Sequence, residues 1–412
     1  MGEKRIVILG NGVAALSAVE SVRRIDRECA ITVVSGEDVP AYSKVLIPYL
    51  ISGERSDIRI RTQAYYEKTG VETVFGKMAV GIGTDSLLLD DGQELPYDKL
   101  LLSPGASPIM PEIPGAKASG VFSINTLEDA KAIARHIENA AQVVFIGGGR
   151  MCLHVVDAFL NRGLRVCIIE SAPEILLSML DLDGAKIIRR KLEERGATVY
   201  TGVDATEIKT DGGKVYRVVA GAGTEIDADI VIASIGNRPN LEVPKTGGIT
   251  VGRGVQVDDM MRTNLDNVFA AGDVTETFNL IRRDERIVCG TWFEAVQQGR
   301  IAGINMAGGT VSYGGSLKMN VIGTESVAAT SIGEIEPPDD SCKVTASCNG
   351  DEYRKIIVKN DQIIGAVLIG EVSDAGIIVS MMRNGTRLSR HAVIDLRRKL
   401  KVGPLFKKRR PV

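Results

Sequence analysis

Cysteine motifs that hold metals are missing from this chain. Its six cysteines form no Cys-x-x-Cys pair, and only three histidines accompany them in 412 residues. Iron–sulfur centres and structural zinc sites need clusters of such ligands, so we expect the chain to hold no metal of its own. Most of the cysteines are expected to be buried thiols in a reducing cytoplasm.

Long apolar runs and a strong charge of one sign are missing as well. No apolar run approaches the roughly 20 residues that a membrane-spanning helix needs, so we expect no membrane span. The net charge of −2 gives no indication of a nucleic-acid partner. The exception is the basic tail Lys407–Arg410, which is either a solvated terminus or a docking segment for an acidic partner.

Glycine is abundant instead, and its first cluster has a phosphate-binding spacing. Gly10, Gly12 and Ala15 follow the apolar run 6–9 and open a predicted helix over 14–25, with a second strand over 30–34. Gly10 permits a tight turn, Gly12 allows close approach of a pyrophosphate, and Ala15 is small enough for helix–strand packing. Glu37 is the nearest acidic residue after the second strand and a candidate for a ribose hydroxyl.

A second cluster repeats the pattern. Gly147 and Gly149 follow a predicted strand over 143–146, and a helix over about 151–162 and a strand over 165–169 come next. Glu170 ends that strand, where a carboxylate binds the adenosine ribose and repels a 2′-phosphate, so NADH is favoured over NADPH. The third glycine position holds Cys152, which is expected to crowd the helix.

Towards the C-terminus, beyond about 311–315, the glycine-rich pattern ends. Strands are predicted over 326–332, 352–358 and 362–369, and a helix over 374–383 that ends at Asn384-Gly385. The fold class is therefore α/β, with two Rossmann-like dinucleotide-binding domains and a C-terminal α+β interface domain. The predicted domains are 1–112 with 241–312, then 113–240, then 313–412.

Further segments, in this order, are typical of one family. They are Ala41–Lys44, Leu102–Ala106, Ala233–Asn240, Val268–Asp273, Ala295–Arg300, Asn305–Gly308 and Arg383–Thr386. With the two fingerprints, they make the chain similar to the flavoproteins that bind two dinucleotides. That family includes NADH-dependent rubredoxin and ferredoxin reductases, NADH oxidases and the flavin part of nitrite reductases.

The resemblance implies FAD and NADH as cofactors and assigns roles to single residues. Gly272 and Asp273 are expected to hold the flavin ribityl chain. Pro104 and Gly105 lie in one segment that crosses between the nucleotide domains, and Gly236 lies in the other. Ser43 and Lys44 are expected to face the flavin, where Lys44 either supplies a catalytic positive charge or is merely an exposed lysine.

The departures from the family pattern lie in the second fingerprint. His154 stands where relatives carry Glu, and it either hydrogen-bonds the nicotinamide cofactor and adds pH sensitivity or is a satisfied helix histidine. Cys152, at a helix N-terminus, is expected to have a lowered thiol pKa if it is exposed. No cysteine occurs between Cys29 and Cys152, which argues against a redox cysteine beside the flavin.

Three functions remain open at this point. The first is an NADH:acceptor oxidoreductase that exchanges electrons with a rubredoxin- or ferredoxin-type protein or an iron–sulfur subunit, in either direction. The second is an NADH oxidase that uses oxygen. The third is a flavin-bearing assembly subunit whose NAD site has degenerated. The C-terminal domain resembles one that often mediates dimerisation, so an oligomer or a larger complex is expected.

Overall fold

The computed structural model describes residues 4–389, so the basic tail lies outside the described residues. Contacts group these residues into two compact units. The first contains 4–47, 55–107 and 237–316, and the second contains 48–54, 108–236 and 317–389. Each unit is described by itself below.

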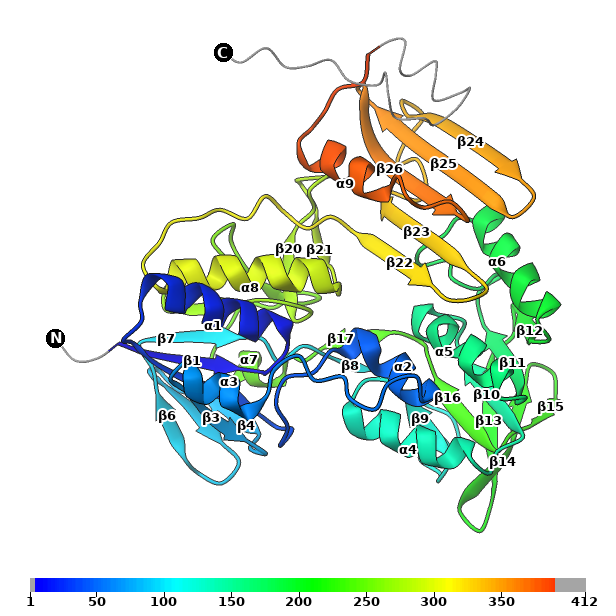
Figure 1. The fold of residues 1–412 in the computed structure, drawn as a ribbon, viewed down its shortest axis with the longest axis horizontal. Helices are drawn as coiled ribbons and strands as arrows, with labels where there is room; N and C mark the ends of the chain where they lie inside the picture. The colour runs from blue at the N-terminus through cyan, green and yellow to red at the C-terminus, as the bar shows by residue number, and fades with distance from the viewer. Residues whose placement is uncertain (1–3, 390–412) are drawn as a thin grey trace. The chain divides into compact units, whose positions relative to one another are not determined.

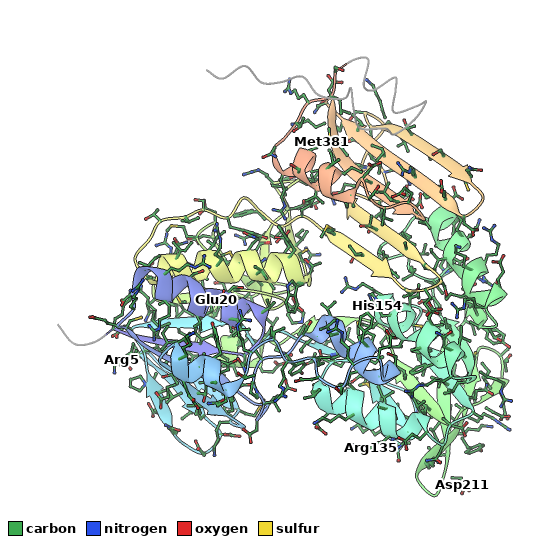
Figure 2. The ribbon with its side chains drawn as sticks, in the orientation of Figure 1. Arg5, Glu20, Arg135, His154, Asp211 and Met381 are labelled. Carbon is green, nitrogen blue, oxygen red and sulfur yellow. The ribbon has the colours of Figure 1, made fainter. Side chains whose placement is uncertain are left out.

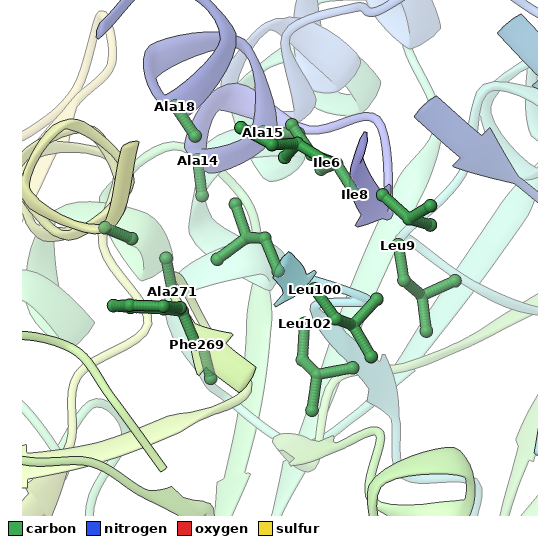
Figure 3. Close-up of a cluster of buried hydrophobic side chains, with 14 of the residues drawn as sticks. Ile6, Ile8, Leu9, Ala14, Ala15, Ala18, Leu100, Leu102, Phe269 and Ala271 are labelled. Atoms are coloured by element: carbon green, nitrogen blue, oxygen red, sulfur yellow. The ribbon is translucent and has the colours of Figure 1, made fainter. Parts of the chain in front are cut away.

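A five-stranded parallel sheet forms the centre of the first unit (Figure 1). Its strand order is β19 (Val268–Ala270), β7 (Lys99–Leu102), β1 (Arg5–Leu9), β2 (Ala30–Ser35) and β3 (Val71–Phe75). The central strands are apolar on both faces, as parallel strands covered on two sides must be. Ile6 and Ile8 of β1 contribute to a core that also contains Leu100 and Leu102 of β7 (Figure 3).

Two helices pack closely on one face of this sheet. They are α1 (Val13–Ile25) and α8 (Trp292–Met306), which lie side by side in Figure 1. A Cβ on Gly299 would lie 2.1 Å from the Ala14 carbonyl oxygen, and one on Gly303 would lie 2.5 Å from that of Ala18. Only glycine fits at these two positions, because the helix backbones themselves are in contact.

The second unit repeats the architecture of the first. Its parallel sheet has the order β12 (Thr198–Thr201), β11 (Arg165–Glu170), β10 (Gln142–Ile146), β16 (Ile230–Ala233) and β9 (Val121–Ser123). Each unit also contains an antiparallel three-stranded sheet. In the sequence it comes just before the strand that pairs with β1 in the first unit, β7, and with β10 in the second unit, β16. These sheets are β4 (Ala79–Ile82), β5 (Ser86–Leu89) and β6 (Glu94–Pro96), and β13 (Ala205–Asp211), β14 (Lys214–Ala220) and β15 (Thr224–Asp227).

The second unit also contains an antiparallel sheet near the C-terminus. Its order is β22 (Met319–Gly323), β23 (Ala328–Gly333), β26 (Gln362–Ile369), β25 (Glu352–Lys359) and β24 (Lys343–Asn349), with α9 (Ala375–Arg383) against it. The sequence predicted neither β22 nor β24. Strand β24 is exposed along almost its whole length, so it lacks the alternation that marks a half-buried strand.

The remaining elements include a two-stranded sheet of β17 (Asn237–Pro239) and β8 (Ala106–Pro108), a three-stranded sheet in the order β18 (Val255–Gln256), β20 (Thr275–Phe278) and β21 (Arg286–Val288), and the other helices. These helices are η1 (Lys44–Leu46), α2 (Ile47–Ser52), α3 (Gln63–Lys68), α4 (Leu127–Ile137), α5 (Arg150–Asn161), α6 (Leu182–Glu194) and α7 (Glu242–Thr246). Within residues 4–389, no helix combines the length and apolarity that crossing a membrane requires.

The structure confirms the predicted fold class, and the predicted strands and helices of both fingerprints begin and end within one residue of the observed ones. The division into three domains stays a prediction. Tyr313, which the sequence placed where the pattern changes, belongs to the first unit and is only 7% exposed.

Candidate functional site

The first glycine turn closes directly on a neighbouring strand end. The Gly10 backbone has φ +105°, and a Cβ there would lie 2.1 Å from the Ser103 carbonyl oxygen. The Gly10 amide donates to the Val34 carbonyl at 2.8 Å, and the Ser103 amide donates to that of Leu9 at 2.8 Å. The turn therefore ties together the carboxyl ends of β1, β2 and β7, which is where parallel sheets bind ligands.

The helix that follows this turn begins without a side-chain cap. Gly12 is the N-cap residue of α1, no side chain accepts a hydrogen bond there, and the first turn contains no acidic residue. A Cβ on Gly12 would meet no atom within 4 Å. By contrast, Thr126 caps α4 and Asp181 caps α6 with side-chain hydrogen bonds. The start of α1 thus offers amide donors and a positive dipole end to an anion.

The second glycine turn has the same construction. The Gly147 backbone has φ +97°, and a Cβ there would lie 2.5 Å from the Ser234 carbonyl oxygen. The Gly147 amide donates to the Ile169 carbonyl at 2.8 Å, and the Ser234 amide donates to that of Ile146 at 2.7 Å. Gly149 caps α5 without a side-chain bond or an acidic residue in the first turn.

Ser103 and Ser234 are site residues that the sequence analysis did not single out. Each follows a strand and stands in a Ser-x-Gly segment, 103–105 and 234–236. Each occupies the same place against its glycine turn. The signal that was available is this repeat of Ser-x-Gly, one copy for each fingerprint.

Glu170 contacts the second glycine turn directly. Its Oε2 accepts from the Gly148 amide at 2.8 Å, and its Oε1 accepts from the Ala172 amide at 2.9 Å. Backbone donors therefore fix this carboxylate in place. The carboxylate stands beside the uncapped start of α5, and its role towards NADH stays a prediction.

The condition for a lowered thiol pKa at Cys152, which is exposure, is not met. Its side chain is fully buried, and burial followed by the nearby Glu170 charge raises the pKa of the thiol well above its ordinary value. A neutral buried thiol is inert, because the thiolate is the nucleophile. Cys152 instead packs behind the turn, with its amide donating to Ser234 Oγ at 3.3 Å.

His154 lies one turn further along α5 and is half-buried (Figure 2). Burial, and then the positive charge of Arg150, lower the pKa of its imidazole to about 4. The ring is therefore neutral near physiological pH, and the expected pH sensitivity is displaced to acidic pH. A hydrogen bond from His154 to the cofactor stays a prediction.

Asp273 and Gly272 follow β19, at the same end of the first sheet as the glycine turn. Gly272 has φ +85°, and a Cβ there would lie 3.2 Å from that of Ala14. A Cβ on Gly290 would lie 3.5 Å from Asp273 Cγ. Gly290 thus lies next to this carboxylate, and Gly272 lies next to the first turn of α1.

Segment 37–44 is joined to the first glycine turn through Tyr66, another residue that the sequence analysis missed. The buried Tyr66 hydroxyl donates to Asn11 Oδ1 at 2.6 Å and accepts from the Ala41 amide at 3.3 Å. Asn11 Nδ2 donates to the Val39 carbonyl at 3.3 Å. One of two adjacent tyrosines in a six-residue helix gave no sequence signal for this role.

The predicted residues of this segment differ in their surroundings. Ser43 is buried, and its amide donates to the Ile58 carbonyl at 2.9 Å, whereas Lys44 begins η1 and is exposed. The Glu37 carboxylate accepts from the Tyr42 hydroxyl at 2.9 and 3.0 Å. Their roles towards a cofactor stay predictions.

The two crossover segments also take defined positions. The Pro104 carbonyl accepts from Asn240 Nδ2 at 2.9 Å, and the Gly105 carbonyl accepts from the Asn240 amide at 3.1 Å. Gly105 and Gly236 both have positive φ, of +73° and +111°. Pro104 lacks an amide hydrogen but still takes part in this contact through its carbonyl.

Two dinucleotides fit the residues present. In each unit a tight loop that only glycine can form leads into a helix of more than three turns. The N-terminus of that helix has no side-chain cap, so its amides are available to an anion. The first unit gathers Gly10, Gly12, Ala15 and Asp273 at one sheet edge, and the second gathers Gly147, Gly149 and Glu170 at the corresponding edge.

Comparison with known proteins extends this picture. The chain is similar over 403 residues to the nitrite reductase [NAD(P)H] of Bacillus subtilis, at 27% identity, which covers 96% of this chain and 49% of the relative. It is 33% identical over 318 residues to the NADH oxidase of Methanocaldococcus jannaschii, and the match covers 74% of this chain and 70% of the relative. The chain spans about half the length of the curated relatives first matched.

A solved structure agrees over most of the chain. The NAD-dependent persulfide reductase of A. fulgidus superposes with a TM-score of 0.86 at 26% identity, covering 92% of this chain and 77% of that one. The model of the rubredoxin NAD+ reductase C-terminal domain matches residues 317–386. The model of pyridine nucleotide-disulphide oxidoreductases matches residues 4–299. The chain belongs to the pyridine nucleotide-disulphide oxidoreductase family, whose members use FAD and NADH.

Proposed function

We propose that this chain is an FAD-dependent NADH:acceptor oxidoreductase that exchanges electrons with a redox protein of rubredoxin or ferredoxin type, or with an iron–sulfur subunit of a larger complex. The observation that carries the proposal is the duplicated glycine turn with an uncapped helix behind it. One such site suits one dinucleotide, and two suit a flavin and a nicotinamide. The C-terminal family match, named for rubredoxin reductases, supports the class of acceptor.

In this proposal the domain of residues 1–112 with 241–312 binds FAD, and the domain of residues 113–240 binds NADH. Gly10, Gly12 and Ala15 admit the FAD pyrophosphate, and Asp273 accepts from the ribityl hydroxyls. The remaining proposed FAD contacts are Glu37, Ser43, Lys44, Pro104, Gly105 and Gly272. The proposed NADH contacts are Gly147, Gly149, His154, Glu170 and Gly236. Residues 313–412 form the interface domain.

The bound flavin supplies hydride acceptance from NADH and onward transfer of the electrons. The chain's own residues bind and orient the two cofactors, and Lys44 places a positive charge that stabilises negative charge beside them. Neutral His154 is a hydrogen-bond partner rather than a charge. The buried Cys152 takes no part in the chemistry. We also propose a cytoplasmic location, since the cysteines of the described residues are free thiols.

The test is anaerobic stopped-flow mixing of the FAD-loaded chain with NADH. Loss of the visible flavin absorbance is the expected result, and an unchanged flavin at saturating NADH contradicts the proposal. Calorimetric titration with NADH then separates a degenerate NAD site, which does not bind, from an active one. Electron transfer to purified rubredoxin and ferredoxin, measured against oxygen uptake, separates a protein acceptor from an NADH oxidase activity.

A further inference from the structure

A group of buried polar side chains lies behind the Gly272–Asp273 turn in the first unit. All of its members are at most 7% exposed, and most are at most 2% exposed: Thr275, Thr277, Glu294, Gln298, Tyr313 and Ser316. We call these six residues the buried polar network. Filling the same space with apolar side chains costs no stability in many proteins, so a buried network of this size calls for a reason other than stability.

Gln298, on α8, connects the network to the turn. Its Oε1 accepts from the Gly272 amide at 2.8 Å and lies 2.8 Å from Thr275 Oγ1. Because the Gly272 amide is always a donor, the atom facing it must be the carboxamide oxygen. Gln298 Nε2 therefore points the other way, towards Ser316 Oγ at 3.3 Å and the Tyr313 hydroxyl at 3.5 Å.

Glu294 lies at the far end of the same chain of hydrogen bonds. The Tyr313 hydroxyl donates to Glu294 Oε2 and lies 2.8 Å from Ser316 Oγ. Since its proton goes to the carboxylate, the Tyr313 oxygen is left to accept from Gln298 Nε2. Glu294 thus fixes the direction of the Tyr313 proton, and the Gly272 amide fixes the orientation of the Gln298 carboxamide, so the two ends of the chain of hydrogen bonds agree at the contact between Tyr313 and Gln298.

We propose that Gln298 and Glu294 are positioning residues for the flavin site. They fix the Gly272 amide, and with it the orientation of the Asp273 carboxylate that follows. The inference rests on the proposed function, in which Asp273 holds the flavin ribityl chain. The Gly272 backbone has φ +85°, and a Cβ there would lie 3.2 Å from that of Ala14 at the start of α1. A shift of the turn therefore disturbs the pyrophosphate end of the same site.

The test compares Gln298→Met with the wild-type chain. Gln298→Met keeps the side-chain length but removes the acceptor of a buried amide, so we expect the Kd for FAD to rise about ten-fold or more. The visible circular dichroism of the bound flavin should change as well. In the apoprotein, hydrogen exchange of the Gly272 amide should accelerate, which tests the positioning without any flavin.

Two substitutions of Glu294 and one control variant distinguish a loss of positioning from simple misfolding. Glu294→Gln keeps an acceptor for the Tyr313 hydroxyl and should stay within about two-fold of the wild-type Kd, whereas Glu294→Leu removes it and should weaken FAD binding several-fold. The matched control is Asn305→Leu on the same helix. Asn305 is 7% exposed and holds Met260 and Val311 by 2.8 to 2.9 Å hydrogen bonds, away from the turn.

The inference is overturned if Gln298→Met lowers the melting temperature as Asn305→Leu does but leaves FAD affinity, flavin dichroism and Gly272 exchange unchanged. Equal effects of Glu294→Gln and Glu294→Leu on FAD affinity also overturn it. A wild-type chain that fails to bind FAD contradicts the proposed function instead, and the Gly272 exchange then decides the positioning role alone.

Discussion

The Tyr66 hydroxyl donates to Asn11 Oδ1 at 2.6 Å, and this bond fastens helix α3 to the middle residue of the first glycine turn. The same hydroxyl accepts from the Ala41 amide, so Tyr66 also holds the segment that leads to Ser43 and Lys44. Burial raises the pKa of Tyr66, so the hydroxyl keeps its proton and remains a donor. Two stretches of the proposed FAD site therefore depend on one side chain.

Tyr66→Phe should lower the free energy of unfolding by about 1–3 kcal/mol, because it leaves Asn11 Oδ1 and the Ala41 amide without their buried partner. It should also weaken FAD binding. Urea unfolding and apoprotein titration measure the two effects. Tyr65→Phe is the matched control, since the Tyr65 hydroxyl is buried with no hydrogen-bond partner among the described residues. Equal losses in the two variants would contradict the role of Tyr66.

Gly10 and Gly12 should respond differently to the same substitution. Gly10→Ala places a Cβ 2.1 Å from the Ser103 carbonyl oxygen at φ +105°, so it should destabilise the fold by about 1–3 kcal/mol from backbone strain alone, and by more from the clash. Gly12→Ala meets no atom of the chain within 4 Å and should fold normally but lose FAD affinity. Thermal unfolding of the apoproteins and FAD titration separate the two outcomes. An unimpaired FAD affinity in Gly12→Ala would show that the open space before α1 is not the pyrophosphate site.

Glu170→Gln should lower kcat/KM for NADH by about ten-fold, because the amide replaces a charged acceptor that the Gly148 and Ala172 amides hold in place. The ratio of kcat/KM for NADPH to that for NADH should rise, since the variant no longer repels a 2′-phosphate. Flavin content serves as the internal control, because Glu170 belongs to the second unit and should not affect FAD. An unchanged coenzyme ratio would remove Glu170 from the NADH site.

His154 should make the fold sensitive to acid. Its pKa is about 4 in the folded chain and 6.5 as the reference value, so the unfolded state takes up the proton first. The contribution of neutral His154 to stability is complete above pH 6.5 and is lost as the pH falls towards 4. His154→Gln should therefore reduce the loss of unfolding free energy across this window, by about 3 kcal/mol at most. Urea unfolding across the window measures it.

His136→Gln is the control for that experiment, because His136 lies on α4 with its ring nitrogen 2.9 Å from the Ala132 carbonyl oxygen. An acid dependence that is the same in His154→Gln and the wild type would contradict the burial argument.

The cysteines show what prediction from sequence can settle and what it must leave conditional. Cys29, Cys152, Cys167 and Cys289 are buried, as composition suggested. The lowered thiol pKa at Cys152 was conditional on exposure, and exposure is a tertiary property. The helix start that would lower the pKa is present, but the surrounding side chains exclude water completely and reverse the direction of the shift.

The sequence by itself determined both glycine turns, their strands and helices, and Glu170 at the end of β11, because each depends on residues within about 30 positions of one another. It also determined the α/β class. The tertiary structure alone decided the contacts that close each site. Ser103 reaches Gly10 across 93 positions, and Tyr66 reaches Asn11 across 55. Contacts between such distant residues form only once the chain has folded and the parallel strands bring their carboxyl ends to one edge, and no local pattern encodes that pairing.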